Sequence, residues 1–178
     1  ADRRLGLLCL GTAHYRADSM VRALIILDSL EHTLPTDESQ LRSVGFLVQA
    51  MVFKKLKNNA KAFLAIERSL ALLDTTVYLP EYVDLLIVRG EIQRMALNYD
   101  MALADLLQAE KLADSIGYVY GRLMAQNDQA NIFYDQDRMD EAWNAYLQCS
   151  REAAVLGYSR LANSAYSNLG AVAYMTDR

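Results

Sequence analysis

Small residues recur along this chain at an almost constant interval. The interval is 39 residues at the first step and 40 at each later step, in two parallel series that lie twelve positions apart. The first series is Gly11, Ala50, Gly90, Ala130 and Gly170, and the second series is Ala23, Ala62, Ala102 and Ala142. Two series with one shared period indicate a structural unit that is repeated along the chain, rather than a single irregular core.

The segments between these positions have the periodicity of amphipathic helices. Between 101 and 112, for example, apolar residues stand at 103, 106, 107 and 109, while Glu110 and Lys111 fall on the opposite side. No Asn-Gly turn and no sustained alternation of β-branched residues points to strands. The sequence therefore predicts an all-α fold of nine helices, over residues 3–15, 18–32, 37–57, 59–74, 80–97, 99–115, 119–136, 139–156 and 159–176.

Turn-forming residues stand where antiparallel helical hairpins require them. Gly117 and Gly157 each follow a helical segment, as expected for a left-handed C-terminal cap. Pro80 suits the first turn of a helix, where its missing N–H has no intrahelical partner in any case. Short polar breaks near 16–19, 57–59, 98–100 and 136–138 predict the tight turns within the hairpins.

The spacing of the two small-residue series predicts how the helices of one hairpin cross. Two helices can approach closely where neither carries a bulky side chain. We expect Gly90 and Ala102 to meet at such a crossing, with Leu86, Leu97 and Leu106 filling the space around it.

Composition excludes several function classes. The 178 residues carry a formal net charge of −4 and only scattered basic residues, so no electrostatic footprint for nucleic acid is present. No apolar run approaches the roughly 18–20 residues that a membrane span requires. We expect Cys9 and Cys149 to be buried and reduced, which favours a cytoplasmic location; a periplasmic or secreted protein whose signal peptide has been removed remains an alternative.

The pattern resembles the tetratricopeptide repeat. Each unit has a small residue in its first helix, an alanine twelve residues later in its second helix, and an aromatic or large apolar residue four positions beyond. The matching sets are Gly11/Ala23/Leu27, Ala50/Ala62/Ile66, Gly90/Ala102/Leu106 and Ala130/Ala142/Tyr146, and Gly170 resembles the start of a fifth unit. The resemblance implies a right-handed α-α superhelix of about 4.5 hairpins that spans residues 1–178 as a single domain.

The repeat length departs from the standard one. The standard unit has about 34 residues, whereas this one has 40. Longer units of this kind look like the helical arrays of bacterial regulators, including transcriptional activators, peptide-sensing regulators and the N-terminal regions of some diguanylate cyclases. The second helix of the fifth unit is missing after residue 174, so we expect a fragment of a longer protein, or a homodimer that covers the uncapped end.

Catalytic and metal-binding patterns are missing from the sequence. His14 and His32 have no partner at metal-ligand spacing, and the two cysteines do not form a Cys-x-x-Cys pair. Glycine-rich phosphate loops and nucleophile motifs are also lacking. We therefore expect a protein that is not an enzyme and uses no cofactor or metal.

The groove lined by the first helix of each unit is the better candidate site. Asn127 and Asn131 lie one turn apart on one helix, and Asn168 should come from the next unit. An asparagine side chain donates and accepts hydrogen bonds, and the resemblance implies that such a row holds an extended peptide backbone. Tyr134 and Tyr174 complete the candidate groove. The carboxylate clamp of the family is not reproduced here, because the acids Asp128 and Asp135 occupy the equivalent stretch.

These observations predict a non-catalytic domain that binds a protein or peptide, as the sensory or regulatory region of a bacterial signalling protein. The alternative is a switch gated by a small molecule or peptide, in which ligand binding alters the curvature of the array. Such a switch would control an attached output domain, for example a diguanylate cyclase or a DNA-binding domain.

Overall fold

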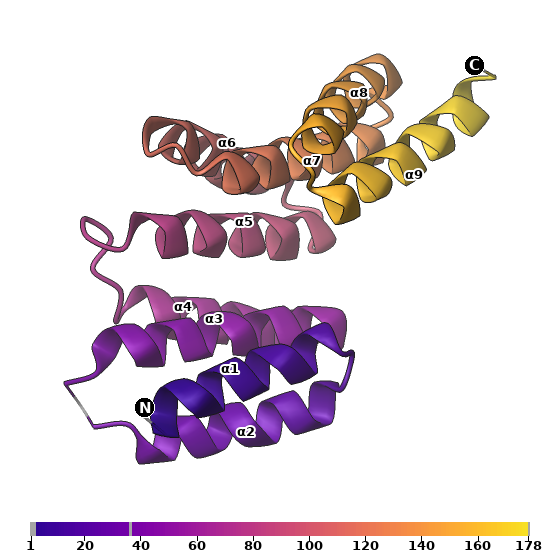
Figure 1. Ribbon diagram of the computed structural model, residues 1–178. Helices are drawn as coiled ribbons and strands as arrows, with labels where there is room; N and C mark the ends of the chain where they lie inside the picture. Colours follow the sequence, from indigo (N-terminus) through magenta and orange to yellow (C-terminus); the bar gives the residue numbers. More distant parts are fainter. Residues whose placement is uncertain (1–2, 36, 178) are drawn as a thin grey trace.

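The computed structural model describes residues 3–35 and 37–177, and within these ranges the chain forms nine α-helices and no strand (Figure 1). Each predicted helix is present, and its ends lie within two residues of the predicted ones, except for the C-terminal end of α4. In chain order the helices are α1 (Arg3–Arg16), α2 (Met20–Thr33), α3 (Ser39–Lys55), α4 (Asn59–Leu70), α5 (Leu79–Met95), α6 (Tyr99–Ser115), α7 (Val119–Asp135), α8 (Met139–Val155) and α9 (Ser159–Thr176).

The helices form two layers that are stacked along one direction. Each helix packs against the next one in the chain, and each odd-numbered helix also packs against the next odd-numbered helix. Within the described ranges, the backbones of the even-numbered helices do not approach one another. The odd-numbered helices therefore form the inner layer and the even-numbered ones the outer layer of a solenoid, with α1 and α9 at opposite ends (Figure 1).

The predicted crossing of Gly90 and Ala102 is confirmed. A Cβ atom on Gly90 would lie 2.9 Å from Cγ of Leu106 and 3.3 Å from the backbone oxygen of Ala102, so only glycine fits there without displacement. Leu86 is fully buried beside this crossing. The prediction for Leu97 was wrong, because this side chain is 70% exposed at the turn after α5. Gly170 has open space around its Cα, since no helix in the described part of the chain follows α9.

The ends of the outer helices depend on one residue of the repeat. Gly117 and Gly157 adopt φ values of +69° and +79° after α6 and α8, which confirms the left-handed caps. Forty positions before Gly117 the chain has Val77, whose β-branched side chain disfavours that conformation. α4 ends at Leu70, seven residues before this position, which corrects the predicted end at 74.

A side-chain turn replaces the missing end of α4. The carboxylate of Asp74 accepts hydrogen bonds from the Thr76 backbone N–H at 3.0 Å and from the Thr76 hydroxyl at 2.6 Å. These bonds lower the pKa of Asp74. The chain then enters α5 with Pro80 in its first turn, as predicted. The result is an irregular connection over residues 71–78 in place of the last turns of a helix.

The two cysteines differ in burial. Cys149 is buried in the core between α7, α8 and α9, whereas Cys9 is exposed on α1. The predicted burial of Cys9 was therefore wrong, because α1 is the first helix and no unit of the described chain covers its outer side.

Candidate functional site

A hollow on the inner layer brings together residues from four helices. Its volume is about 210 Å³, and it lies between the C-terminal halves of α5, α7 and α9, with one residue from α8. Asn131, Tyr134 and Asn168 of the predicted groove line it. The other lining residues are Arg94, Asp135, Tyr146 and Ala171.

The remaining two groove residues lie elsewhere. Asn127 is 95% buried on α7, where its Nδ2 lies 3.4 Å from Oδ1 of Asp128. Tyr174 is 85% exposed near the end of α9 and does not line the hollow. The predicted row is therefore reduced to one asparagine pair, Asn131 and Asn168, with Tyr134 beside it.

Asn131 is the centre of a hydrogen-bond network that joins three helices. Its Nδ2 donates to Oδ1 of Asp128 at 2.9 Å. Its Oδ1 accepts from the Tyr146 hydroxyl at 2.6 Å and from Nδ2 of Asn168 at 3.1 Å. An amide nitrogen carries two protons, so one N–H of Asn131 and the carbonyl oxygen of Asn168 have no hydrogen bond to the described residues. These two groups can serve a ligand in the hollow.

Basic residues of the preceding units also reach this face. Arg94 on α5 forms an ion pair with Asp135 on α7, with 2.5 Å between Nη1 and Oδ2. Lys54 on α3 pairs with Glu91 on α5. Each cation is held by an acid from the neighbouring inner helix, so the pairs tie the units together and leave no isolated positive charge between them.

Asp128 lies under this face and is almost fully buried. It is 3% exposed, and in the two preceding units its repeat position is occupied by Val48 and Val88. Burial raises the pKa of Asp128 to about 8, and the negative charge of Glu91 adds to this effect. The carboxyl group therefore carries a proton at neutral pH. Its Oδ2 has no hydrogen-bond partner among the described atoms.

The sequence analysis missed Arg94 and Tyr146 as members of the site, and the repeat itself held the information. Arg94 and Tyr134 are forty residues apart and occupy the same position of successive units. Successive inner helices place such positions side by side, so superposing the units predicts that the two side chains share one surface.

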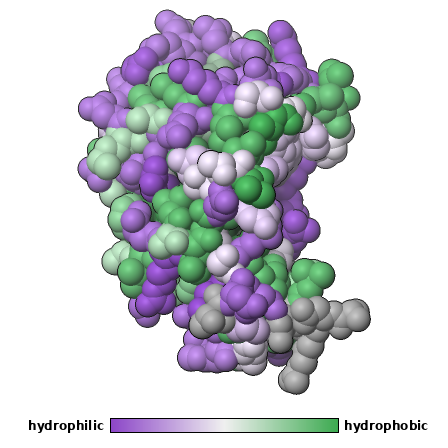
Figure 2. Space-filling model, turned by 90° about the vertical axis from the view of Figure 1, so that its left-hand side faces the viewer, coloured by the Kyte–Doolittle hydropathy of each residue, from purple (hydrophilic) through white to green (hydrophobic). Residues whose placement is uncertain are grey.

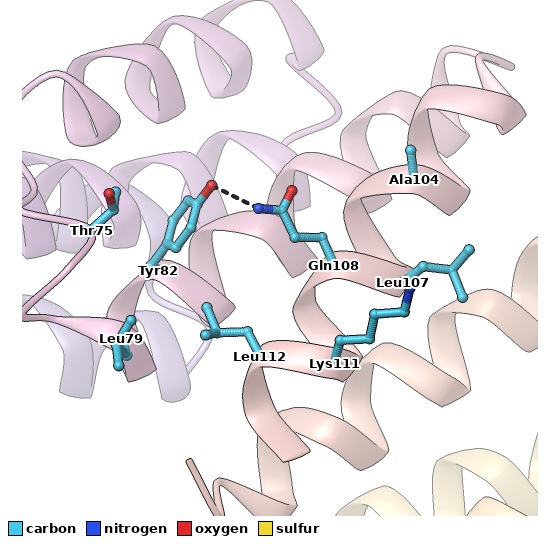
Figure 3. A pocket seen from close by; sticks show the side chains of 8 residues that line it. All are labelled: Thr75, Leu79, Tyr82, Ala104, Leu107, Gln108, Lys111 and Leu112. Carbon is cyan, nitrogen blue, oxygen red and sulfur yellow. Dashed lines mark hydrogen bonds between the residues drawn. The ribbon is translucent and has the colours of Figure 1, made fainter. Parts of the chain in front are cut away.

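A second and larger hollow lies near the N-terminal end of α5, where the α4–α5 connection meets α6 (Figure 3). Its volume is about 570 Å³. Nε2 of Gln108 donates a hydrogen bond to the hydroxyl oxygen of Tyr82 at 3.2 Å across it. Its lining residues are mainly apolar, and they are Thr75, Leu79, Tyr82, Ala104, Leu107, Gln108, Lys111 and Leu112. No sequence motif pointed to this hollow.

Apolar side chains are also exposed around this connection. Val77 is 62% exposed and Leu107 is 45% exposed. Figure 2 views the molecule from the left-hand side of Figure 1, which carries the α4–α5 connection, and shows apolar surface interrupted by hydrophilic side chains.

Among the described residues, no group of three or more His, Cys, Asp or Glu side chains is arranged to hold a metal ion. No described helix combines the length and the hydropathy needed to cross a bilayer.

Comparisons with known proteins add no family to this description. No protein-family model matches the chain, and no curated protein sequence matches it. The class of protein is therefore defined by the architecture, which is an all-helical repeat array.

Proposed function

We propose that this domain is a non-catalytic protein- or peptide-binding array of the tetratricopeptide type, and that it serves as the sensory or regulatory region of a cytoplasmic bacterial signalling protein. The observation that carries the proposal is the inner hollow, in which Arg94, Asn131 and Asn168 converge from three successive inner helices. The two series of small residues give the array its repeat, and the resemblance stated above gives it the binding role.

The chemistry of the hollow suits a peptide backbone. A free N–H on Asn131 and a free carbonyl oxygen on Asn168 match the acceptor and the donor of a peptide unit. The hydroxyl of Tyr146 holds Asn131 in place, so its amide does not have to be ordered when a ligand binds. The Arg94–Asp135 pair forms one wall, which makes a peptide with both acidic and basic side chains a better partner than a uniformly charged one.

Selection from a random-peptide library, followed by calorimetric titration, tests this proposal. Asn131→Ala combined with Asn168→Ala should weaken the selected peptides by at least about tenfold, since two hydrogen bonds to the ligand are lost. Asn144→Ala, on the exposed face of α8, is the matched control and should leave the affinity unchanged. Equal affinity of the double variant and the wild type, with circular dichroism showing an intact fold, would show that the peptide does not bind in the inner hollow.

A ligand-gated switch is the second candidate. It is favoured by the junction between α4 and α5, which is less extensively packed than the junction between α6 and α7. A change in angle at this junction would alter the curvature of the whole array. Ligand-dependent compaction in solution scattering would support the switch, and an unchanged scattering profile at saturating peptide would reject it.

Self-association through α9 is a further part of the proposal. Gly170, Tyr166 and Tyr174 are exposed on α9, on the side where the preceding units have a second helix. A homodimer would cover this side. Sedimentation equilibrium of the wild type and of Tyr166→Glu distinguishes a monomer from a homodimer. A wild type that stays monomeric at all concentrations would exclude the dimer.

A further inference from the structure

The hollow at the α4–α5 connection exists because one unit of the array departs from the repeat. α6 and α8 each have 17 residues, whereas α4 has 12. In place of the last turns of α4 the chain forms the irregular connection, and Thr75 of this connection lines the hollow together with residues of α6. Val77, in the same connection, stands at the repeat position of Gly117.

The floor and the walls of this hollow are apolar. Leu79 and the ring of Tyr82 come from the first turns of α5, and Leu107 and Leu112 come from α6 (Figure 3). A volume of about 570 Å³ lies within the usual range for small-molecule sites. Burying this apolar surface against the apolar chain of a ligand removes both from water, which favours binding.

The polar groups of the hollow are mostly donors. The Tyr82 hydroxyl oxygen accepts a hydrogen bond from Gln108, which leaves its own O–H free to donate. The Thr75 hydroxyl adds a second donor. Lys111 is the one charged residue among those that line the hollow in the described chain, and no ion pair holds its ammonium group there. No carboxylate is present in the lining, so an anion would meet no opposing negative charge.

We propose that this hollow binds a free amphiphilic carboxylate, a molecule with one apolar chain and one anionic head. The apolar chain of the ligand lies against Leu79, Leu107 and Leu112, and the head pairs with Lys111. This ligand site lies at the N-terminal end of α5, whereas the peptide hollow lies at its C-terminal end, and it does not depend on the peptide-binding proposal.

The next unit of the array offers a matched control. Leu147 and Arg151 on α8 occupy the repeat positions of Leu107 and Lys111. In this unit Glu110 on α6 accepts hydrogen bonds from Gln126 at 2.8 Å and from Gln129 at 2.7 Å, both on α7. An equivalent change in this unit therefore alters the same chemistry without touching the hollow.

Calorimetric titration with decanoate, below its micelle concentration, tests the proposal. We expect one molecule to bind per chain, with octanoate binding up to about 15-fold more weakly, since each buried methylene contributes about fourfold. Decyltrimethylammonium, with the same chain and the opposite charge, should not bind measurably. Lys111→Glu and Leu107→Gln should each weaken decanoate at least about fivefold, whereas Arg151→Glu and Leu147→Gln should leave it unchanged.

Several outcomes would overturn the proposal. Equal decanoate affinity of Lys111→Glu and the wild type would show that Lys111 does not bind the carboxylate head. Binding of decyltrimethylammonium as tightly as decanoate would show that the hollow is an unspecific apolar surface. Binding to phosphatidylglycerol vesicles without binding of free decanoate would assign the surface to a membrane instead. Val77→Gly provides a second measurement, because extension of α4 seen by circular dichroism should accompany loss of decanoate binding; retained binding with a longer helix would place the ligand elsewhere.

Discussion

Replacing Asp128 by asparagine should stabilise the fold at neutral pH. Asp128 is buried at a position where the two preceding units have valine, and its carboxyl group must keep a proton to stay there. Asparagine has nearly the same shape and no charge. Its side-chain oxygen can still accept the hydrogen bond that Asn131 donates at 2.9 Å. The substitution therefore removes the titration and keeps the contact.

The magnitude follows from the two pKa values of the group. The pKa of Asp128 is about 8 in the folded chain and about 4 in the unfolded chain. Because the folded pKa is the higher one, the stabilising contribution of the proton is complete below about pH 4 and is lost as pH rises to about 8. Each pH unit in this window lowers the free energy of unfolding by up to about 1.4 kcal/mol. At pH 7 the loss reaches about 4 kcal/mol, which Asp128→Asn should recover in large part.

Urea unfolding followed by circular dichroism at pH 5, 6, 7 and 8 measures this effect. We expect the advantage of Asp128→Asn over the wild type to increase with each step. Asp128→Val, which restores the residue of the earlier units, should follow the same trend with a smaller gain, because the acceptor for Asn131 is lost. Asp137→Asn on the exposed turn after α7 is the control and should shift stability by less than about 0.5 kcal/mol. Parallel pH profiles of the wild type and Asp128→Asn would refute the reasoning.

Three further predictions concern the frame of the array. Ala102→Leu and Ala142→Leu should each destabilise the fold by about 1–3 kcal/mol through overpacking at a hairpin crossing, and an unchanged melting temperature of either variant would contradict the close approach. Leu97 has a φ of +63° at an exposed turn, so Leu97→Gly should raise the urea midpoint by relieving a left-handed strain of about 1 kcal/mol; a lower midpoint would argue against this strain. Val77→Gly should lengthen α4 by up to five residues, the difference between α4 and α6, and a far-ultraviolet spectrum identical to that of the wild type would show that another residue ends the helix.

The sequence alone was sufficient to predict the helical repeat architecture of this protein. The repeat, the order of the helices and the Gly90–Ala102 crossing depend on residues that are close in the chain or related by a fixed period. Helical periodicity and glycine caps act within a few residues, so they can be read without knowledge of the whole molecule. The predicted end of α4 at 74 was too late, because the Asp74 carboxylate bonds Thr76 in a local turn that competes with the helix.

Only the tertiary structure decided which polar side chains meet. Arg94, Asn131 and Asn168 follow one another along the chain at intervals of 37 residues, and their meeting depends on the angle at which each hairpin packs on the previous one. That angle also buried Asp128 and Asn127 and left Leu97 and Tyr174 in water. The packing angle results from many side-chain contacts between neighbouring units. No short stretch of the sequence predicts these contacts. The repeat therefore predicted where the helices lie, whereas their packing determined which surfaces can bind.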